Sequence, residues 1–215
     1  MEKLDPNQFI ITRKRKKYKF ALFNNSPICF EFAQWQKRQV DVVEVGSGNG
    51  LFSVELAARS PEKTFVAIDV KGDRLQKGAA KAESLGLKNI FFVRARADQL
   101  NELFEPDSLE KIWITFPDPF PKKRSAGRRL THNNFLKIYK QLLAPGGHLL
   151  LKHDDRDFFC WSLEQLVASN WQIENLSFDL HEAEGLDEAK ITTTYEQRWM
   201  GEGKQINFVS ATPRA

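Results

Sequence analysis

The sequence predicts an α/β fold with a mostly parallel central sheet and helices on both faces. Short runs of β-branched and aromatic residues alternate with longer stretches of helical period. A glycine-rich turn joins the first such run to the first helical stretch, and no internal repeat or low-complexity segment interrupts the alternation. This rhythm is typical of parallel sheets, because each parallel connection needs a crossover that is usually a helix.

The predicted elements follow this alternation along the chain. Strands are predicted over residues 40–45, 64–69, 90–94, 111–116 and 148–152, with helices over 49–59, 72–85, 133–143 and 156–169. Beyond Trp171 the pattern weakens to a strand near 172–179, an acidic and Thr-rich stretch, and a last strand near 205–210. We expect antiparallel pairing at this C-terminal edge. Residues 1–39 are predicted to form a basic, partly flexible N-terminal arm, and residues 40–215 a single folded domain.

The composition excludes several classes of protein. No apolar stretch approaches the roughly 20 residues of a membrane span, and no hydrophobic run follows the N-terminal charges. We therefore expect a cytoplasmic protein with no membrane partner. Cys29 and Cys160 lack the spacing of a disulfide scaffold or a zinc site, so both are expected to be buried thiols.

The positive charge of the chain is concentrated in two places. Residues 1–39 hold nine basic and three acidic residues, a net of +6, so the remaining chain carries −2 of the total of +4. A second cluster contains no acid and consists of Lys122, Lys123, Arg124, Arg128 and Arg129. A solvated tail or an exposed loop would explain either cluster alone, whereas two clusters together favour a polyanionic partner.

The glycine turn after the first strand indicates a nucleotide-like ligand. Gly46, Gly48 and Gly50 are also compatible with an ordinary strand-to-helix turn, and the third comes one residue too early for a dinucleotide site. Glu44, at the strand end, would repel a pyrophosphate and attract a cation. Asp69 ends the second strand, where an acid can accept hydrogen bonds from both ribose hydroxyls. A cationic adenosine fits these residues better than a dehydrogenase cofactor, and S-adenosylmethionine is such a ligand.

Asp118 lies in a loop braced by prolines. The buried run 111–116 opens into Pro117, Pro119 and Pro121, which alternate with Asp118 and Phe120. Since proline fixes its own φ and keeps the preceding residue out of the right-handed helical region, we expect Phe116, Asp118 and Phe120 in an extended loop. Such a loop could aim a carboxylate at a ligand or at a nearby helix terminus. The cations that follow it favour a site crossed by a charged polymer.

These segments resemble one family, the bacterial tRNA (guanine-N7-)-methyltransferases, which have a Rossmann-like class I methyltransferase fold. The family signature Phe-Pro/Ser-Asp-Pro-Trp-Pro-Lys-Lys-Arg-His, followed by Lys-Arg-Arg-Leu-Thr, is matched by residues 116–125, FPDPFPKKRS, and 127–131, GRRLT. Residues 151–154, LKHD, resemble a segment that contains Lys-Thr-Asp in the family, and residues 193–196, TTYE, match its Thr-x-Tyr-Glu. The similarity covers about residues 40–210.

The resemblance implies S-adenosylmethionine as cofactor, tRNA as partner, and methylation of N7 of a guanine in the variable loop. It implies a catalytic role for Asp118, which would also contact the cofactor. Cofactor-binding residues would be Glu44, Gly46, Gly48, Gly50, Asp69, Arg96, Asp98 and Asp118. The substrate side would include Lys122, Arg124, Arg128, Arg129, Asp154, Thr193, Tyr195 and Glu196, joined by the basic arm over residues 13–19.

The chain departs from the family pattern at five positions. Arg96 stands where an Asp or Asn usually receives the adenine, and Asp98 follows two residues later. Phe120 replaces a Trp, Ser125 and Gly127 replace a His and a Lys, and His153 replaces a Thr. The acids around His153 are interpreted as a helix-start cluster rather than a metal site.

The chemistry leaves several alternatives open. Guanine N7 carries an in-plane lone pair, so its methylation needs no strong base. Asp118 could stabilise the ring as it becomes cationic, or accept hydrogen bonds from the N1–H and N2–H₂ edge. Phe116 and Phe120 could stack on a base or belong to the core. A methyltransferase for an exocyclic base nitrogen and a non-catalytic RNA-binding relative are the rival functions, and the sequence is compatible with a monomer or a homodimer.

Overall fold

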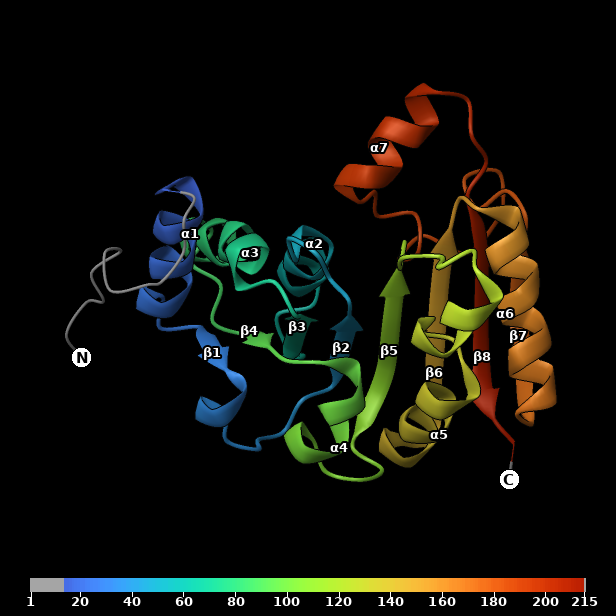
Figure 1. Cartoon of the computed structure of the whole chain (residues 1–215), viewed down its shortest axis with the longest axis horizontal. Helices are drawn as coiled ribbons and strands as arrows, with labels where there is room; N and C mark the ends of the chain where they lie inside the picture. The colour runs from blue at the N-terminus through green and yellow to red at the C-terminus, as the bar shows by residue number, and fades with distance from the viewer. Residues whose placement is uncertain (1–13, 215) are drawn as a thin grey trace.

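The alternating runs of the sequence fold into the predicted α/β architecture, which the computed structural model describes for residues 14–214 (Figure 1). The helices are α1 (Lys14–Asn25), α2 (Leu51–Arg59), α3 (Gly72–Ser84), α4 (Leu100–Leu103), α5 (Asn133–Leu142), α6 (Arg156–Ala168) and α7 (Thr194–Gly201), with 3₁₀ turns η2 (Phe32–Gln34), η3 (Ala97–Gln99) and η4 (Lys123–Arg128). The strands are β1 (Cys29–Glu31), β2 (Val42–Val45), β3 (Phe65–Asp69), β4 (Ile90–Arg94), β5 (Leu109–Thr115), β6 (Leu143–His153), β7 (Trp171–Ser177) and β8 (Asn207–Pro213).

The strands form one sheet in the order β1-β4-β3-β2-β5-β6-β8-β7. The pairs from β1 to β6 are parallel, whereas β8 runs antiparallel to both of its neighbours, so the predicted sheet and its antiparallel edge are confirmed. From β2 the chain winds through β3 and β4 to one side, and from β5 through β6 to the other. The order therefore reverses between β2 and β5, and open α/β sheets bind ligands beyond the carboxyl ends of such a pair.

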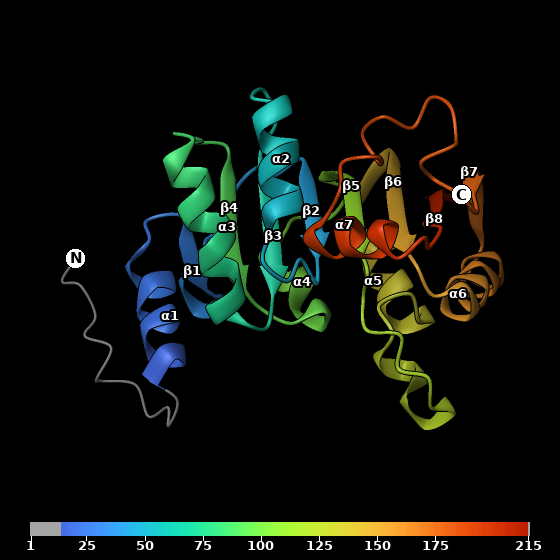
Figure 2. The same cartoon turned by 90° about the horizontal axis from the view of Figure 1, so that it is seen from above.

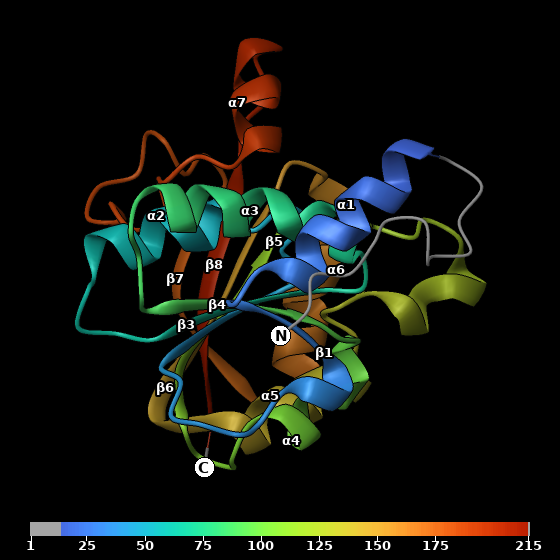
Figure 3. The same ribbon diagram turned by 90° about the vertical axis from the view of Figure 1, so that its left-hand side faces the viewer.

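Helices cover both faces of this sheet (Figure 3). One face is packed by α1, α2 and α3, which contribute side chains such as Phe52 and Leu75 to one hydrophobic core. The other face is packed by α4, α5 and α6, which contribute Leu103, Tyr139 and Phe158 to a second core. Among the residues that the structure describes, none of the helices combines the length and the hydropathy of a membrane-spanning segment.

All four side chains of β2 are buried, because this strand is covered on both faces. Three of them are valines and the fourth is Glu44, which is only 2% exposed. A carboxylate in such a strand needs hydrogen-bond partners or a counter-charge. The burial of Glu44 therefore indicates that the sheet contains a polar site at this strand.

Helix α7 stands beyond the carboxyl end of β5 (Figures 1 and 2). It starts with a capping box in which the Thr193 hydroxyl accepts from the Glu196 amide, and the Glu196 carboxylate accepts from the Thr193 amide, both at 3.0 Å. This reciprocal pair satisfies two amides that the first turn leaves without helical partners. Thr193 is thereby held over the edge of the sheet that carries the strand ends.

Part of the expected N-terminal arm is regular structure. Residues 14–25 form α1, which packs on α3, and residues 29–31 form β1, which pairs with β4. Phe20, Ala21 and Phe23 of α1 are buried, but only Phe20 and Phe23 among them have helical spacing, and five basic residues precede them in the helix. The hydrophobic period is therefore too short to identify this helix from the sequence. Residues 1–13, including Arg13, lie outside the described part of the chain.

Two local expectations were wrong. Phe116 and Phe120 have φ values of 48° and 41°, so the loop is left-handed at both positions and not extended. Proline excludes the right-handed helical region for its predecessor, and tertiary contacts select the left-handed one, at a cost of about 1–2 kcal/mol for each residue. Cys29 is buried as expected, but Cys160 is exposed because it lies on the solvent side of α6.

Candidate cofactor and nucleic-acid site

A cleft of about 650 Å³ lies at the carboxyl ends of the central strands. We call it the rim cleft. Its walls come from the β2–α2 loop, the end of β3, η3, the loop after β5, and the start of α7. It brings together nine of the residues singled out from the sequence: Glu44, Gly46, Gly48, Asp69, Arg96, Asp98, Asp118, Arg128 and Thr193. The carboxylates of Glu44, Asp69 and Asp118, which come from three different strand ends, thus border one cleft.

The glycine loop is fastened to β3. The Gly48 amide, in a left-handed conformation with φ 59°, donates to the Asp69 carboxylate at 2.9 Å. A Cβ at this position would meet no atom within 4 Å, so the loop presents bare backbone to open space. Gly50, also predicted at the cofactor, is instead the buried N-cap of α2, where a Cβ would lie 2.6 Å from the Phe92 ring. Its role in the loop is close packing.

Glu44 is held by two hydroxyl groups. The Ser53 and Thr115 hydroxyls donate to its two carboxylate oxygens at 2.5 and 2.6 Å. Burial raises the pKa of Glu44 to about 7, although these hydrogen bonds and the nearby Lys152 ammonium act to lower it. The carboxyl group therefore changes charge close to neutral pH, and a cation in the rim cleft would favour its ionised form.

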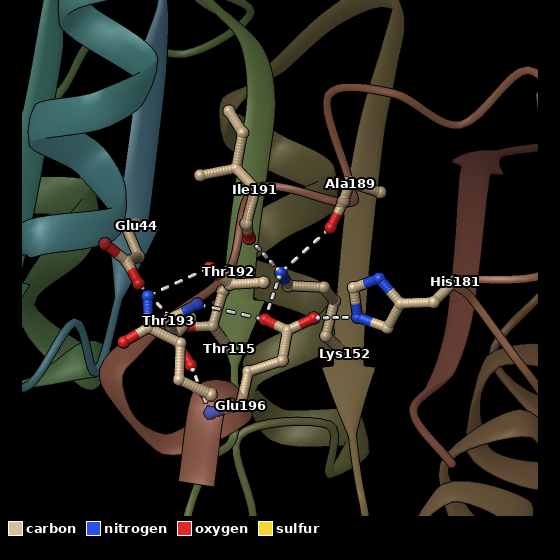
Figure 4. A network of polar contacts seen from close by, with 10 residues as sticks. Glu44, Thr115, Lys152, His181, Ala189, Ile191, Thr192, Thr193 and Glu196 are labelled. Carbon is tan, nitrogen blue, oxygen red and sulfur yellow. Dashed lines mark hydrogen bonds and ion pairs between the residues drawn. The ribbon is translucent and has the colours of Figure 1, made fainter. Parts of the chain in front are cut away.

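Lys152 connects the sheet to α7 through a buried polar network (Figure 4). Its fully buried ammonium donates to the Glu196 carboxylate at 2.8 Å and to the carbonyls of Ala189 and Ile191 at 2.9 and 2.7 Å. All three ammonium hydrogens have acceptors, as a buried lysine requires. His181 also contacts Glu196, at 2.9 Å. Glu196 is thus an internal ion-pair partner that anchors α7 to β6.

Asp69 ends β3 with both carboxylate oxygens in use. It accepts from the Gly48 amide and, at 2.8 Å, from the Lys71 amide. Burial raises its pKa, and the two amides and the charge of Arg74 oppose that rise. Each carboxylate oxygen keeps a further lone pair for a ligand.

Arg96 and Asp98 form an exposed ion pair across η3. The Arg96 Nε donates to Asp98 at 2.8 Å, and a terminal guanidinium nitrogen contacts the other carboxylate oxygen. This contact lowers the pKa of Asp98. Both side chains border the rim cleft, so the arginine stands there as the partner of a carboxylate.

His153 holds the proline-braced loop through a hydrogen bond to its backbone. Its Nδ1 accepts a hydrogen bond from the Asp155 amide at 2.8 Å, which leaves Nε2 to donate to the Pro117 carbonyl at 2.9 Å. Burial lowers its pKa, which favours this neutral form. The imidazole therefore fixes the peptide that immediately precedes Asp118, while the Asp118 side chain itself is exposed at the rim.

The basic residues after this loop differ in their surroundings. Lys122 and Arg124 are exposed, and neither lines the rim cleft. The Arg128 guanidinium lies 4.3 Å from the centre of the Phe120 ring and borders the cleft. Arg129 is half-buried, donates to the Phe120 carbonyl at 3.2 Å and lies 4.2 Å from the Trp161 ring. Arg128 and Arg129 thus shape the loop as well as contributing charge.

Two other predicted residues, Asp154 and Glu196, do not line the rim cleft. Asp154 faces the Lys204 ammonium at 3.5 Å. Glu196 is fully buried in the network with Lys152. Tyr195 lies in the first turn of α7, and its side chain is outside the described atoms.

The structure adds residues to the candidate site that the sequence analysis did not identify. Ser47, Thr115 and Lys152 belong to the rim cleft or its support, and the buried Ser47 hydroxyl has no hydrogen-bond partner in the described part of the protein. Lys152 had left a signal in the sequence, since a lysine directly after Leu149-Leu150-Leu151 interrupts a buried strand. The other two are small polar residues at strand ends, which are common in any turn.

The fold is shared with solved methyltransferase structures. The 16S rRNA methyltransferase KamB superposes with a TM-score of 0.62 at 17% identity, over 85% of this chain and 90% of that chain. A 16S rRNA (adenine(1408)-N(1))-methyltransferase from Catenulisporales acidiphilia, crystallised with its cosubstrate SAM, gives 0.56 at 15% identity, over 100% and 95% of the two chains. At these identities the likeness shows the fold alone.

Sequence comparison is more specific. Residues 38–209 match a family described as "Putative methyltransferase". A tRNA (guanine-N(7)-)-methyltransferase from Brevibacillus brevis is 34% identical over 197 residues, covering 90% of this chain and 91% of the relative. The enzyme of the same name from Lachnoclostridium phytofermentans is 34% identical over 207 residues, covering 96% and 88%. This chain therefore belongs to the tRNA (guanine-N(7)-)-methyltransferase family of class I methyltransferases.

Proposed function

We propose that this protein transfers a methyl group from S-adenosylmethionine to N7 of a guanine in tRNA. The observation that carries the proposal is the convergence of Glu44, Asp69 and Asp118 on one cleft, bordered by the cationic segment around η4. Acidic side chains suit a cofactor that bears a sulfonium and an ammonium, and cationic side chains suit a phosphate polymer. Membership of the family supports tRNA as the substrate and guanine N7 as the atom that is methylated. The variable-loop position and the cytoplasmic location are the finer predictions that the resemblance adds.

The residues of the rim cleft fit this cofactor. Glu44 offers a buried negative charge, Asp69 has lone pairs for the ribose hydroxyls, and the bare backbone at Gly48 allows close approach. The buried Ser47 hydroxyl supplies a polar group that the protein leaves unpaired. When bound, S-adenosylmethionine supplies an electrophilic methyl group on sulfur.

Asp118 would act on the guanine by charge and position. N7 attacks with its own lone pair, so no proton has to be removed before the carbon–nitrogen bond forms. The guanine ring gains positive charge in this step, and a fixed carboxylate nearby lowers the energy of that state. The Pro117 carbonyl, held by His153, and the flanking prolines restrict where the Asp118 carboxylate can lie.

The nucleic-acid side of the proposal involves exposed cations. Lys122, Arg124 and Arg128 would contact phosphates of the strand that carries the target guanine. Phe120, already covered on one side by the Arg128 guanidinium, would place an aromatic ring at the mouth of the cleft. Thr193, at the start of α7, would border the bound guanine.

The direct test is methyl transfer to an unmodified tRNA transcript with labelled S-adenosylmethionine. We expect 7-methylguanosine when the product is digested and its nucleosides are identified by mass spectrometry. Methylation on an exocyclic nitrogen would replace the proposed reaction by its nearest rival. Cofactor binding without methyl transfer to any tRNA would indicate a non-catalytic relative.

Asp118→Ala tests the catalytic assignment. Loss of an electrostatic stabiliser at the reacting centre should reduce kcat by roughly 10²- to 10³-fold while the thermal unfolding curve and tRNA affinity remain close to those of the wild type. Glu62→Ala, an exposed acid in the α2–β3 connection, is the matched control and should retain full activity. Turnover by Asp118→Ala within twofold of the control would remove Asp118 from the mechanism.

A further inference from the structure

A second, smaller cleft of about 230 Å³ adjoins the rim cleft on its α1 and α3 side. We call it the side cleft. It is lined by Lys19 of α1, by Arg74 and Lys77 of α3, and by the glycine loop at Gly48 and Asn49. Gly48, Asn49 and Arg74 line both clefts, so the two hollows share a wall.

The side cleft is cationic. Lys19, Arg74 and Lys77 line it from two helices, and Asp73 is the single acid among its lining residues, which leaves a formal charge of +2. In the described part of the chain, none of these three cationic side chains forms a hydrogen bond or an ion pair, although the charge of Arg74 acts on the Asp69 carboxylate in the rim cleft. By contrast, surface cations such as Arg59 and Lys63 pair with a neighbouring glutamate. Unpaired cations that meet at a hollow from separate helices are typical of an anion-binding surface.

Its position relates it to the proposed substrate. Helices α1 and α3, which carry the cations of the side cleft, lie on the β3–β4 side of the sheet (Figure 2), whereas η4 follows β5, on the other side of β2 in the strand order. A nucleic-acid strand whose guanine enters the rim cleft would therefore meet cations on both flanks. Two phosphate contacts on opposite sides of a reacting base fix the direction of the strand better than one contact can.

We propose that the side cleft binds a backbone phosphate of the tRNA, through the ammonium groups of Lys19 and Lys77 and the guanidinium of Arg74. This proposal rests on the tRNA substrate given in the proposed function. The sequence placed Lys19 in the basic arm expected to bind tRNA, but it did not indicate Arg74 or Lys77. Lys19 and Lys77 are 58 residues apart, and only the packing of α1 on α3 brings them to one hollow.

The test uses the double variant Lys19→Gln, Lys77→Gln, because these two residues line the side cleft and not the rim cleft. Binding of unmodified tRNA would be followed by fluorescence anisotropy over a range of salt concentrations. We expect affinity at low salt to fall roughly 5- to 30-fold, and the slope of log K against log salt to flatten by about 1 to 2. S-adenosylmethionine affinity, measured by calorimetry, should not change.

Two further variants make the result specific. Lys88→Gln, Lys137→Gln removes the same charge from exposed positions outside both clefts and should change tRNA affinity less than about twofold. Asp73→Asn removes the acid of the side cleft and should strengthen binding. A Lys19/Lys77 variant with wild-type affinity and salt slope would overturn the proposal, as would equal losses in the Lys88/Lys137 control.

This outcome is separable from that of the proposed function. Binding affinities report on the side cleft even when no methyl group is transferred. If the wild-type protein methylates tRNA and the Lys19/Lys77 variant binds tRNA as tightly as the wild type, only the proposal for the side cleft is contradicted. If the wild-type protein binds tRNA through these lysines but does not methylate it, only the proposed methyl transfer is contradicted.

Discussion

The acidic flank of the rim cleft, formed by Glu44 and Asp69, and the basic flank that lies next to the cleft, formed by Lys122 and Arg124, are built in different ways. Glu44 is 2% exposed and takes two hydroxyl hydrogen bonds, and Asp69 takes two amide hydrogen bonds. Lys122 and Arg124 are exposed, and neither side chain has an ion-pair or hydrogen-bond partner among the described residues. One flank is a fixed, partly desolvated set of charges, and the other is a solvated set.

This difference follows from the ligands that the two flanks are proposed to bind. A small cation is held well by a few charges that are already oriented and shielded from water. A long phosphate chain is held by many contacts, each of which is screened by salt and contributes little. Substitutions on the acidic flank should therefore have large individual effects, and substitutions on the basic flank small ones.

The largest effect in this comparison is expected for Glu44→Gln. Loss of the buried charge should weaken S-adenosylmethionine binding by roughly 10- to 100-fold at about pH 8, as calorimetry would measure. Since the pKa of Glu44 is about 7, wild-type affinity should rise as the pH increases through neutrality, while the variant stays flat. Glu55→Gln on α2 is the matched control. A wild-type affinity that does not change between about pH 6 and 8 would contradict the buried titrating carboxylate.

The same substitution should act in the opposite direction on stability. Because the folded-state pKa of Glu44 is raised from 4.5 to about 7, the stability that its neutral form contributes is lost as the pH rises through this range. Without cofactor, Glu44→Gln should therefore unfold at a higher temperature than the wild type above neutral pH. The difference between the two unfolding temperatures should narrow below neutral pH. A constant gap at all pH values would contradict the assignment.

An intermediate effect is expected at His153, whose two hydrogen bonds can be separated. Asparagine can accept from the Asp155 amide but is too short to reach the Pro117 carbonyl, whereas glutamine can reach that carbonyl. We expect His153→Asn to lower kcat about tenfold with little change in the KM for cofactor, and His153→Gln to retain most of the turnover. Equal turnover in the two variants would show that the contact with Pro117 does not position Asp118.

The smallest effect is expected for Lys122→Gln combined with Arg124→Gln. At about physiological salt the KM for tRNA should rise only about threefold, and less as salt increases, because these cations are solvated. The kcat at saturating tRNA should not change. The Lys88/Lys137 double variant again serves as control. A fall in kcat for the Lys122/Arg124 variant would mean that the basic flank takes part in the chemistry.

The sequence predicted the sheet because each central strand is a short apolar run that ends at a turn. The run 90–94 coincides with β4, and 42–45 and 65–69 fall within the predicted strands. It did not identify α1, whose apolar side chains stand behind a basic run, or α7, whose start is a capping box in a Thr-rich stretch. In both cases the helix is stabilised by contacts with distant segments, which local periodicity does not contain.

The candidate site was predictable to the same extent. Glu44, Asp69 and Asp118 could be placed at strand ends because a polar residue after an apolar run marks that position, and parallel strands end at a common edge. The groups around Glu44 could not be predicted, since Thr115 and Lys152 lie 71 and 108 residues away in the sequence. The left-handed turns at Phe116 and Phe120 were also missed, because proline restricts its predecessor without selecting among the remaining conformations.

By itself, the sequence determined which residues carry charge, which runs are buried strands, and that acidic strand ends and basic clusters both occur in one chain. The tertiary structure decided which of those groups lie close together: it buried Glu196 against Lys152, turned His153 toward the Pro117 carbonyl, and placed Lys19 and Lys77 at one cleft. The reason is physical. Residue type and local pattern set the solvation and backbone preferences of each segment, whereas an electrostatic contact depends on distance, and distances between remote segments exist only once the sheet has assembled.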